Sequence, residues 1–117
     1  MNFAEVLADL RACQGVLMTS IADRDGIPVQ SWGGAKGELD EIIAEYSNFL
    51  REVATANREL QLGEIEQVVV ASQRKLIIVT AITVEYLLLT VLERNGNAGK
   101  ARFASRIAAF RLRDDFS

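Results

Sequence analysis

Three apolar runs in the second half of the chain constrain the fold more than any other feature. They lie within residues 64–72, 75–81 and 84–93 and are separated by very short connections. None alternates strictly between apolar and polar residues, so each is expected to be a strand covered on both faces. A sheet covered on both faces needs helices above and below it, which predicts a three-layer α/β domain.

The N-terminal third adds a helix and a hairpin to this sheet. Asn2 and Glu5 have the offset of a capping box, and apolar residues at helical spacing follow to about Cys13. Residues 16–22 and 27–32 are expected to be two strands joined by the tight connection "DRDG". Pro28 cannot donate a ladder hydrogen bond, so its strand is expected at an edge of the sheet.

Residues 38–60, after a flexible "GGAKG" joint, are expected to form one long helix. Its apolar sector spans about 160° on a helical wheel, wider than the ~100° that one core-facing stripe requires. We therefore expect the helix to cover two surfaces, its own sheet and the same helix of a second copy, although a deeply seated helix in a monomer stays open. The sector consists of a central stripe and a neighbouring row: Leu39, Ile43, Tyr46, Leu50, Val53 and Leu60, with Ile42, Phe49 and Ala56 beside it.

A last helix is expected over residues 98–113, with Phe103, Ile107 and Phe110 on one face. Residues 97–113 carry five basic and no acidic side chains, so the remainder of this chain of net charge −3 carries −8. The region 37–62 has a net charge of −4. This separation of charge favours docking of a partner or a second subunit. The commonest reason for such a basic segment is nevertheless a solvated helix face whose cations favour the helix C-terminus. Without interleaved aromatic residues, nucleic acid is disfavoured as a partner.

The stretch "IADRDGIPVQSWGG" raises the question of a metal site or an acid pair. Gly26 is the fourth residue from Asp23 and Trp32 stands where a calcium loop needs glutamate, so a calcium loop is excluded. At a hairpin tip, water keeps both Asp23 and Asp25 ionised, whereas catalytic carboxylates need burial or close coupling. The two aspartates are therefore interpreted as turn residues, with Gly26 supplying a positive φ.

The remaining composition disfavours an enzyme. The chain has no histidine and one cysteine, and it lacks the glycine-rich phosphate-binding loops. Its serines have no histidine to activate them, and a serine–lysine pair with Lys75 or Lys36 has no recognisable signature. A single cysteine fits a reducing, cytoplasmic setting, and no stretch reaches the ~18 apolar residues of a membrane span. All 117 residues are expected to form one domain.

Together these segments resemble the Roadblock/dynein-light-chain family, and within it the prokaryotic MglB-like members. The resemblance extends over residues 2–113 and rests on the order and spacing of the segments. Four stretches carry it: the hairpin "GVLMTSIADRDGIPVQSW", the long helix that ends before "EIEQVVVAS", the pair "KLIIVTAITVEYLLLTVLE", and "NAGKARFASRIAAF".

The resemblance implies a mixed α/β domain whose five-stranded antiparallel sheet has the order 2-1-5-4-3, with helices on both faces. Its two edges are then the Pro28 strand and the strand within 64–72. The second carries no proline or lysine, so it is an open edge that invites pairing. Two copies joined there, with their long helices in contact, would make an isologous homodimer. The candidate dimer-interface residues are Ile42, Tyr46, Phe49, Val53, Ala56, Ile65, Gln67, Val69 and Ala71.

Members of this family regulate or scaffold small Ras-like GTPases, and MglB-like members activate GTP hydrolysis without an arginine finger. The resemblance therefore implies a homodimeric GTPase regulator that has no cofactor and is not itself an enzyme. The alternative is a non-catalytic dimeric adaptor in a signalling or motility complex. The candidate GTPase contacts are Lys36, Glu45, Asn48, Glu52, Thr55 and Glu59.

Overall fold

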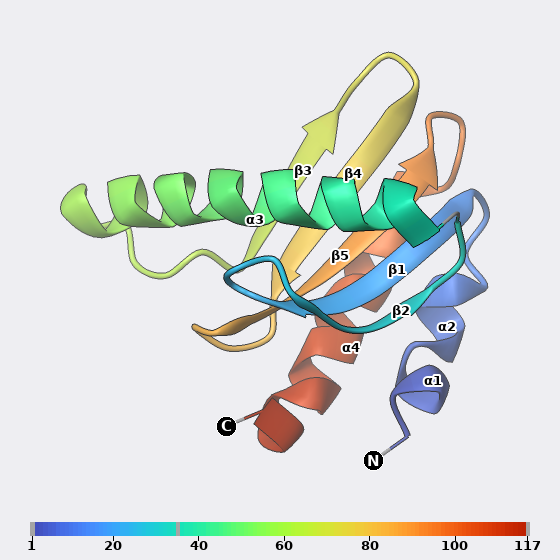
Figure 1. Cartoon of the computed structure of the whole chain (residues 1–117), viewed down its shortest axis with the longest axis horizontal. Helices are drawn as coiled ribbons and strands as arrows, with labels where there is room; N and C mark the ends of the chain where they lie inside the picture. The colour runs from blue at the N-terminus through green and yellow to red at the C-terminus, as the bar shows by residue number, and fades with distance from the viewer. Residues whose placement is uncertain (1, 35, 117) are drawn as a thin grey trace.

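The sheet is antiparallel and has the strand order β2-β1-β5-β4-β3 (Figure 1), as expected. A computed structural model of the chain describes residues 2–34 and 36–116. The strands are β1 (Val16–Asp23), β2 (Pro28–Trp32), β3 (Gln67–Ala71), β4 (Lys75–Ala81) and β5 (Tyr86–Glu93). The helices are α1 (Phe3–Val6), α2 (Ala8–Arg11), α3 (Lys36–Glu59) and α4 (Ala98–Phe116).

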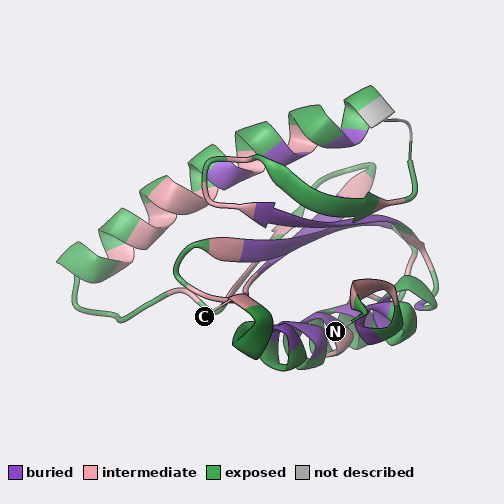
Figure 2. Cartoon of the chain, turned by 60° about the horizontal axis from the view of Figure 1, so that its bottom comes forward, coloured by how far each residue is buried: buried purple, intermediate pink, exposed green. Residues whose placement is uncertain are grey.

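Helices cover both faces of the sheet, which confirms the three-layer prediction. Figure 2 shows α3 on one face and α1, α2 and α4 on the other, with the buried residues concentrated in the sheet between them. Each face has its own apolar cluster: Ile21, Ile78 and Leu88 pack toward α4, whereas Val79 and Leu89 pack toward α3. Strands β1, β4 and β5 are thus buried on both sides, which explains why their sequences do not alternate. The expectation that the strand within 64–72 is also covered on both faces is wrong: β3 lies at the sheet edge, and none of its residues is buried.

Several element boundaries differ from those expected. The N-terminal helix is divided at Leu7, whose ψ of 0° interrupts the helical turn. The long helix begins at Lys36, inside the segment interpreted as a joint, and β3 begins at Gln67 instead of residue 64. Strand β5 begins at Tyr86 because the Thr83 hydroxyl accepts hydrogen bonds from the backbone N–H groups of Glu85 and Tyr86, which extends the preceding turn.

Two glycines form a close backbone crossing where α2 leads into β1 and β5 leads into α4. Gly15 has a φ of +91°, and a Cβ atom there would lie 2.5 Å from the Cα of Gly96. The two segments are hydrogen-bonded on both sides of the crossing, from the N–H of Glu93 to the Gly15 carbonyl (2.8 Å) and from the N–H of Asn97 to the Gln14 carbonyl (2.9 Å). Only glycine at position 15 satisfies both the conformation and the spacing.

The long helix extends past the sheet. Figures 1 and 2 both show the C-terminal turns of α3 projecting beyond the β3 edge. The buried positions of α3 are Leu39, Ile43 and Ser47, all in its N-terminal half. Farther along, Val53 is only half-buried and Leu60, just after the helix, is 68% exposed. The C-terminal half of the apolar stripe is therefore left without full cover by this chain.

Candidate interaction surface

Strand β3 leaves one side of its backbone open. It pairs with β4 alone, and the N–H of Ala81 donates to the carbonyl of Glu66 while the N–H of Ser72 donates to the carbonyl of Lys75. These bonds fix the alternation of the ladder, so that even-numbered residues face β4 and odd-numbered residues direct their backbone groups toward the open edge. Three predicted interface residues, Gln67, Val69 and Ala71, therefore present a row of backbone donors and acceptors.

The opposite edge is protected. Strand β2 begins at Pro28, and its pairing with β1 shifts register between Ile21 and Ala22, which marks a bulge. A proline and a bulge both disfavour the addition of another strand. The expectation that the Pro28 strand forms a blunted edge is confirmed, and β3 is the edge of this sheet that remains suited to pairing.

The apolar row of α3 continues onto β3. Tyr46 and Phe49 pack edge to face with their ring centroids 6.3 Å apart. Together with Glu45 and with Val70 of β3 they line a shallow hollow of about 260 Å³. The side chain of Phe49 is 41% exposed, and Ile42, Tyr46 and Val53 are half-buried. Tyr46 and Phe49 of the predicted dimer interface thus adjoin Val70, which sequence reasoning missed. The predicted strand residues Gln67, Val69 and Ala71 direct their side chains to the opposite face of the sheet, toward α4, and only their backbone groups reach the open edge beside α3.

The predicted GTPase contacts are distributed along the outer side of α3. Glu45, Asn48, Glu52, Thr55 and Glu59 are all exposed, whereas the side chain of Lys36 lies outside the described residues. Asn48 and Thr55 are joined through Arg51, whose guanidinium donates to the Asn48 side chain (3.1 Å) and whose carbonyl accepts from the Thr55 hydroxyl (3.0 Å).

Arg51 also connects α3 to the β1–β2 turn. Its Nη1 donates to the carbonyl of Arg24 (2.9 Å) and to the carboxylate of Asp25 (3.1 Å). Sequence reasoning did not select Arg51, because its partners lie 26 and 27 residues away and no local pattern indicates them. The arginine at the centre of the exposed α3 surface is therefore already engaged within the chain.

The two aspartates between β1 and β2 form a turn, as interpreted from the sequence. The carboxylate of Asp23 accepts hydrogen bonds from the N–H groups of Asp25 (2.9 Å) and Ile27 (3.0 Å). Gly26 has a φ of +85°, and a Cβ atom there would lie 3.1 Å from the Cα of Ala44 in α3. The turn thus packs against α3. Among the described residues, no group of three or more cysteine or acidic side chains is placed to hold a metal ion.

A backbone cap and an ion pair stabilise the C-terminal end of α3. Gln61 takes a left-handed conformation (φ +58°), and the N–H of Leu62 donates to the carbonyl of Asn57 (2.8 Å), as in a Schellman cap. The Arg58 guanidinium then makes two hydrogen bonds to the Glu64 carboxylate, at 3.0 and 3.1 Å. These hydrogen bonds hold the pKa of Glu64 below its ordinary value, and the positive charges of Arg58 and Arg24 act in the same direction.

We expect an Arg58→Ala variant to raise the pKa of Glu64 toward its ordinary value, because both the hydrogen bonds and the nearest positive charge are removed. A pKa depressed in the folded state favours folding above roughly pH 4.3, the ordinary value, and this contribution is lost as the pH falls through the folded-state pKa. Carbon-13 NMR of the side-chain carboxyl measures the shift. Arg106→Ala serves as the control, since Arg106 pairs with Glu66. Identical Glu64 titration curves in the Arg58→Ala variant and the parent would contradict the prediction.

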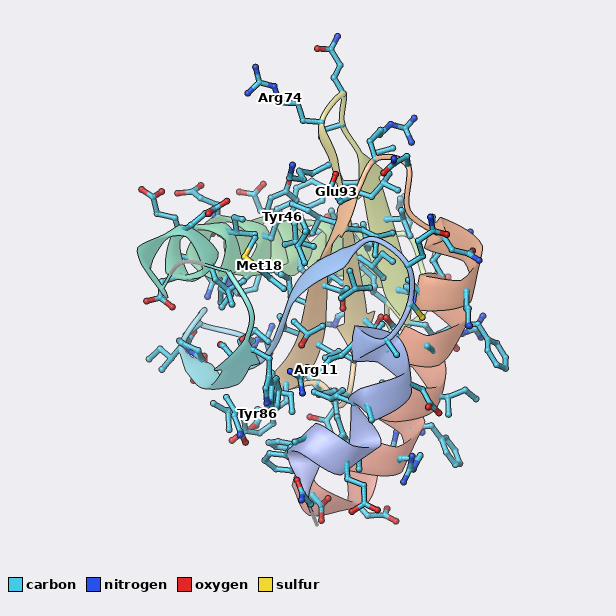
Figure 3. All side chains as sticks on the ribbon, turned by 90° about the vertical axis from the view of Figure 1, so that its right-hand side faces the viewer. Arg11, Met18, Tyr46, Arg74, Tyr86 and Glu93 are labelled. Atoms are coloured by element: carbon cyan, nitrogen blue, oxygen red, sulfur yellow. The ribbon has the colours of Figure 1, made fainter. Side chains whose placement is uncertain are left out.

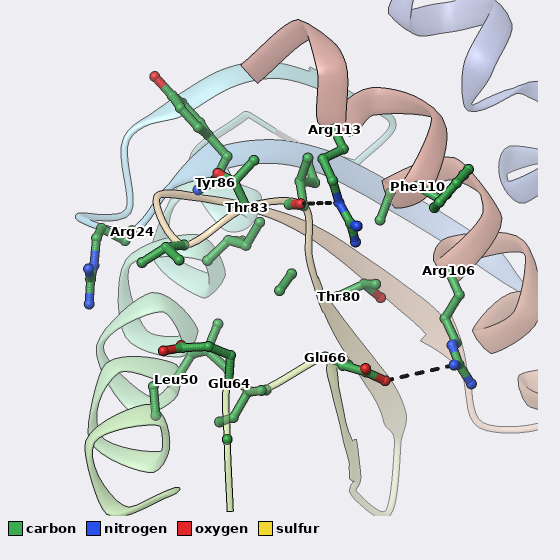
Figure 4. Close-up of a pocket in the computed structure, with 18 of the residues that line it drawn as sticks. Arg24, Leu50, Glu64, Glu66, Thr80, Thr83, Tyr86, Arg106, Phe110 and Arg113 are labelled. Atoms are coloured by element: carbon green, nitrogen blue, oxygen red, sulfur yellow. Dashed lines mark hydrogen bonds and ion pairs between the residues drawn. The ribbon is translucent and has the colours of Figure 1, made fainter. Parts of the chain in front are cut away.

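A larger groove lies between the C-terminal half of α3 and the last helix. Figure 4 shows it crossing the turn that precedes β5 and the segment before β3. Its volume is about 1090 Å³. Its apolar lining includes Leu50, Leu62 and Ile65. Arg106 approaches Glu66 at 3.8 Å across its α4 side. The lining includes Arg58 and Leu62, so the groove adjoins the exposed end of α3, but it includes no residue of β3.

The architecture, with one blunted edge, one open edge and helices on both faces, defines the class as a small three-layer α/β domain. The chain belongs to the Roadblock/LC7 domain family, whose model matches residues 2–93. Comparison with curated protein sequences finds no match. None of the described helices combines the length and apolar character needed to cross a membrane.

Solved structures support this assignment. The chain is similar to a Roadblock/LC7 domain from Streptomyces avermitilis (TM-score 0.86, 16% identity, covering 98% of each chain). It is also similar to the gliding protein MglB from Thermus thermophilus (TM-score 0.83, 18% identity, covering 96% of this chain and 86% of that one). MglC from Myxococcus xanthus is 27% identical, with a TM-score of 0.68 and coverage of 99% and 100%. The predicted family and fold are both confirmed.

Proposed function

We propose that this protein is a homodimeric regulator of a small Ras-like GTPase, acting through GTPase activation or scaffolding. The observation that carries the proposal is the open β3 edge beside the uncovered apolar row of α3. Antiparallel pairing of two β3 strands about a two-fold axis perpendicular to the sheet would join both sheets into one. The same operation places both α3 helices on one face, where the projecting end of each helix would reach the other copy.

The exposed side of α3 supplies the chemistry for recognition. Glu45, Glu52 and Glu59 are exposed there, so a GTPase surface with basic residues is the complementary partner. Arg51 is bonded to Asp25, and Arg58 is bonded to Glu64. Engagement of these two arginines within the chain supports a mechanism in which the dimer holds the GTPase in a competent conformation and supplies no arginine finger.

GTP hydrolysis by a Ras-like GTPase from the same organism tests the proposal. Saturating protein is expected to raise the turnover rate at least about tenfold. The Glu52→Lys/Glu59→Lys variant should abolish this effect, because it reverses the charge of the contact surface at two positions outside the hollow of Tyr46, Phe49 and Val70. Glu5→Lys/Asp9→Lys introduces the same charge change in α1 and α2, on the other face of the sheet, and should keep it. Unchanged hydrolysis at saturating protein would exclude the activating role.

An adaptor is the second candidate. The apolar hollow of Tyr46, Phe49 and Val70 is suited to protein–protein contacts. Binding of another protein there would not depend on a nucleotide. An adaptor would bind its partner equally well in the GTP and GDP states and leave hydrolysis unchanged. A regulator would prefer the GTP-bound state, so a pull-down with both nucleotides separates the two functions.

A further inference from the structure

The last helix directs three large apolar side chains away from the sheet. Phe103, Ile107 and Phe110 recur at the helical spacing of one face and are 67%, 47% and 69% exposed. The opposite face of α4 consists mainly of small residues, and these are the ones that pack on the sheet: Ala101, Ser105, Ala108, Ala109 and Leu112. The three large residues, which we call the α4 ridge, therefore project from the molecule. Exposed apolar patches of this kind mark interaction sites.

Basic side chains lie on both flanks of the α4 ridge. Arg102, Arg106 and Arg113 occupy the flank nearer to β3 and β4, where Arg106 approaches Glu66 and Arg113 bonds to the Ile82 carbonyl at 3.4 Å. Lys100 and Arg111 occupy the other flank, and neither forms an ion pair with a described residue.

The acidic residues of this layer lie at its margins. Asp114 and Asp115 follow the ridge at the end of α4, and Glu5 and Asp9 belong to α1 and α2. Over Ala98–Phe116, five basic residues against two acidic ones give a net charge of +3, in a chain whose total is −3. The positive charge of the molecule is thus concentrated around the α4 ridge.

We infer that the α4 ridge binds the surface of an anionic lipid membrane. Apolar side chains between two rows of basic residues are the pattern of helices that lie in the membrane interface, where the apolar groups enter the acyl boundary and the cations contact anionic head groups. Helix α4 would lie on the membrane without crossing it. The lipid class is specified by charge: phosphatidylserine or a similar anionic phospholipid attracts this surface, whereas a zwitterionic surface offers only the apolar contribution.

The geometry favours a membrane over an acidic protein helix. The groove of Figure 4 is the concave site that a partner helix needs, and the three ridge residues form part of its lining. Among the basic residues of α4, Arg106 and Arg113 also line the groove, whereas Lys100 and Arg111 do not. A peptide seated there would leave Lys100 and Arg111, on the other flank, without contacts. A flat anionic surface touches the ridge and both flanks together.

The proposed dimer would double this contact. A two-fold axis perpendicular to the sheet places both α4 ridges on the face opposite the two α3 helices, so both ridges meet one plane. This step rests on the proposed function, whereas membrane binding by a single ridge does not. The acidic α3 surfaces would then face away from the membrane and stay accessible to a GTPase.

Sedimentation with lipid vesicles tests the inference. The protein is expected to bind vesicles of phosphatidylcholine with about 30% phosphatidylserine, and to bind pure phosphatidylcholine at least about tenfold more weakly. Phe103→Ser/Phe110→Ser and Lys100→Glu/Arg111→Glu should each weaken binding to the anionic vesicles at least about tenfold. All four positions are exposed, so circular dichroism should show unchanged folding.

Two matched controls keep the test specific. Ile27→Ser removes a side chain of similar exposure (62%) from the β1–β2 turn. Arg74→Glu reverses a charge at the tip of the β3–β4 hairpin, which Figure 3 shows pointing away from α4. Neither variant should change vesicle binding.

Three outcomes would overturn the inference. They are absence of vesicle binding, equal binding to both vesicle compositions, and binding that the ridge variants leave unchanged. Capture of an acidic amphipathic peptide in place of vesicles would assign the ridge to a protein partner, which also overturns it. Light scattering on the same samples reports the dimer, so failure of lipid binding by a dimeric protein leaves the proposed GTPase function intact.

Discussion

Replacing Val69 with lysine is expected to leave the protein monomeric. Val69 is the central residue of β3 and faces Ile78 in the β3–β4 ladder. If two β3 strands pair along their full length, residue 69 lies directly opposite its own copy across the two-fold axis. Two lysines would then face each other at the centre of the interface, and like charges placed in this way cost several kcal/mol. The dissociation constant should rise at least ~100-fold, which corresponds to about 3 kcal/mol.

Light scattering over a range of protein concentrations measures this effect. The control is Val29→Lys, which makes the same substitution on the blunted edge strand β2, where Val29 is 48% exposed. This variant should associate like the parent. A Val69→Lys protein that remains fully dimeric would show that the copies do not pair through β3, and would remove the main support for the proposed arrangement.

Gly15→Ala is expected to destabilise the folded protein by about 2–4 kcal/mol, which lowers the melting temperature by roughly 10 °C. Two effects add at this position. An alanine must adopt the left-handed φ of +91°, and its methyl group would lie 2.5 Å from the Cα of Gly96. The crossing backbone cannot move away easily, because Asn97 and Glu93 are hydrogen-bonded to the Gln14–Gly15 segment.

Two other glycines separate these contributions. Gly63 also has a positive φ (+94°), but a methyl group added there would have no atom within 4 Å, so Gly63→Ala should cost only the conformational part, about 1–2 kcal/mol. Gly37 lies in the first turn of α3 with ordinary φ and open space, so Gly37→Ala should be neutral or slightly stabilising. Thermal unfolding of the three variants gives the comparison. Equal effects of Gly15→Ala and Gly63→Ala would show that the crossing relaxes at no cost.

Much of the fold could be predicted because its local signals agree with its packing. Two of the three apolar runs identified strands covered on both faces, β4 and β5, whereas β3 has no buried residue. Pro28 identified a blunted edge, and the spacing around Gly26 identified a turn. The strand order came from the family resemblance, since periodicity alone does not specify which strands are neighbours. Boundaries were less accurate: residues 64–66 and 84–85 have strand-like sequences, but the first segment precedes β3 and the second lies in the turn at Thr83.

The surfaces were harder to predict. The spacing of Phe103, Ile107 and Phe110 is also that of a core-facing stripe, and only the packing of Ala101, Ala108 and Ala109 reveals that small residues face the sheet. These alanines let the helix approach the sheet closely, which directs the large side chains outward. The Arg51 contacts were equally hidden, because they join segments brought together only by the docking of α3 on the β1–β2 turn.

In the proposed dimer, the projection of α3 beyond its own sheet would link folding to abundance. A helix whose C-terminal half lacks a full apolar cover gains stability from whatever molecule supplies that cover, and in the proposed dimer a second copy would supply more of it as the concentration rises. At low cellular levels the end of α3 would fray, and the surface that we assign to GTPase recognition would lose its order with it. Assembly and competence for signalling would then rise together, so that the amount of protein in the cell would regulate both.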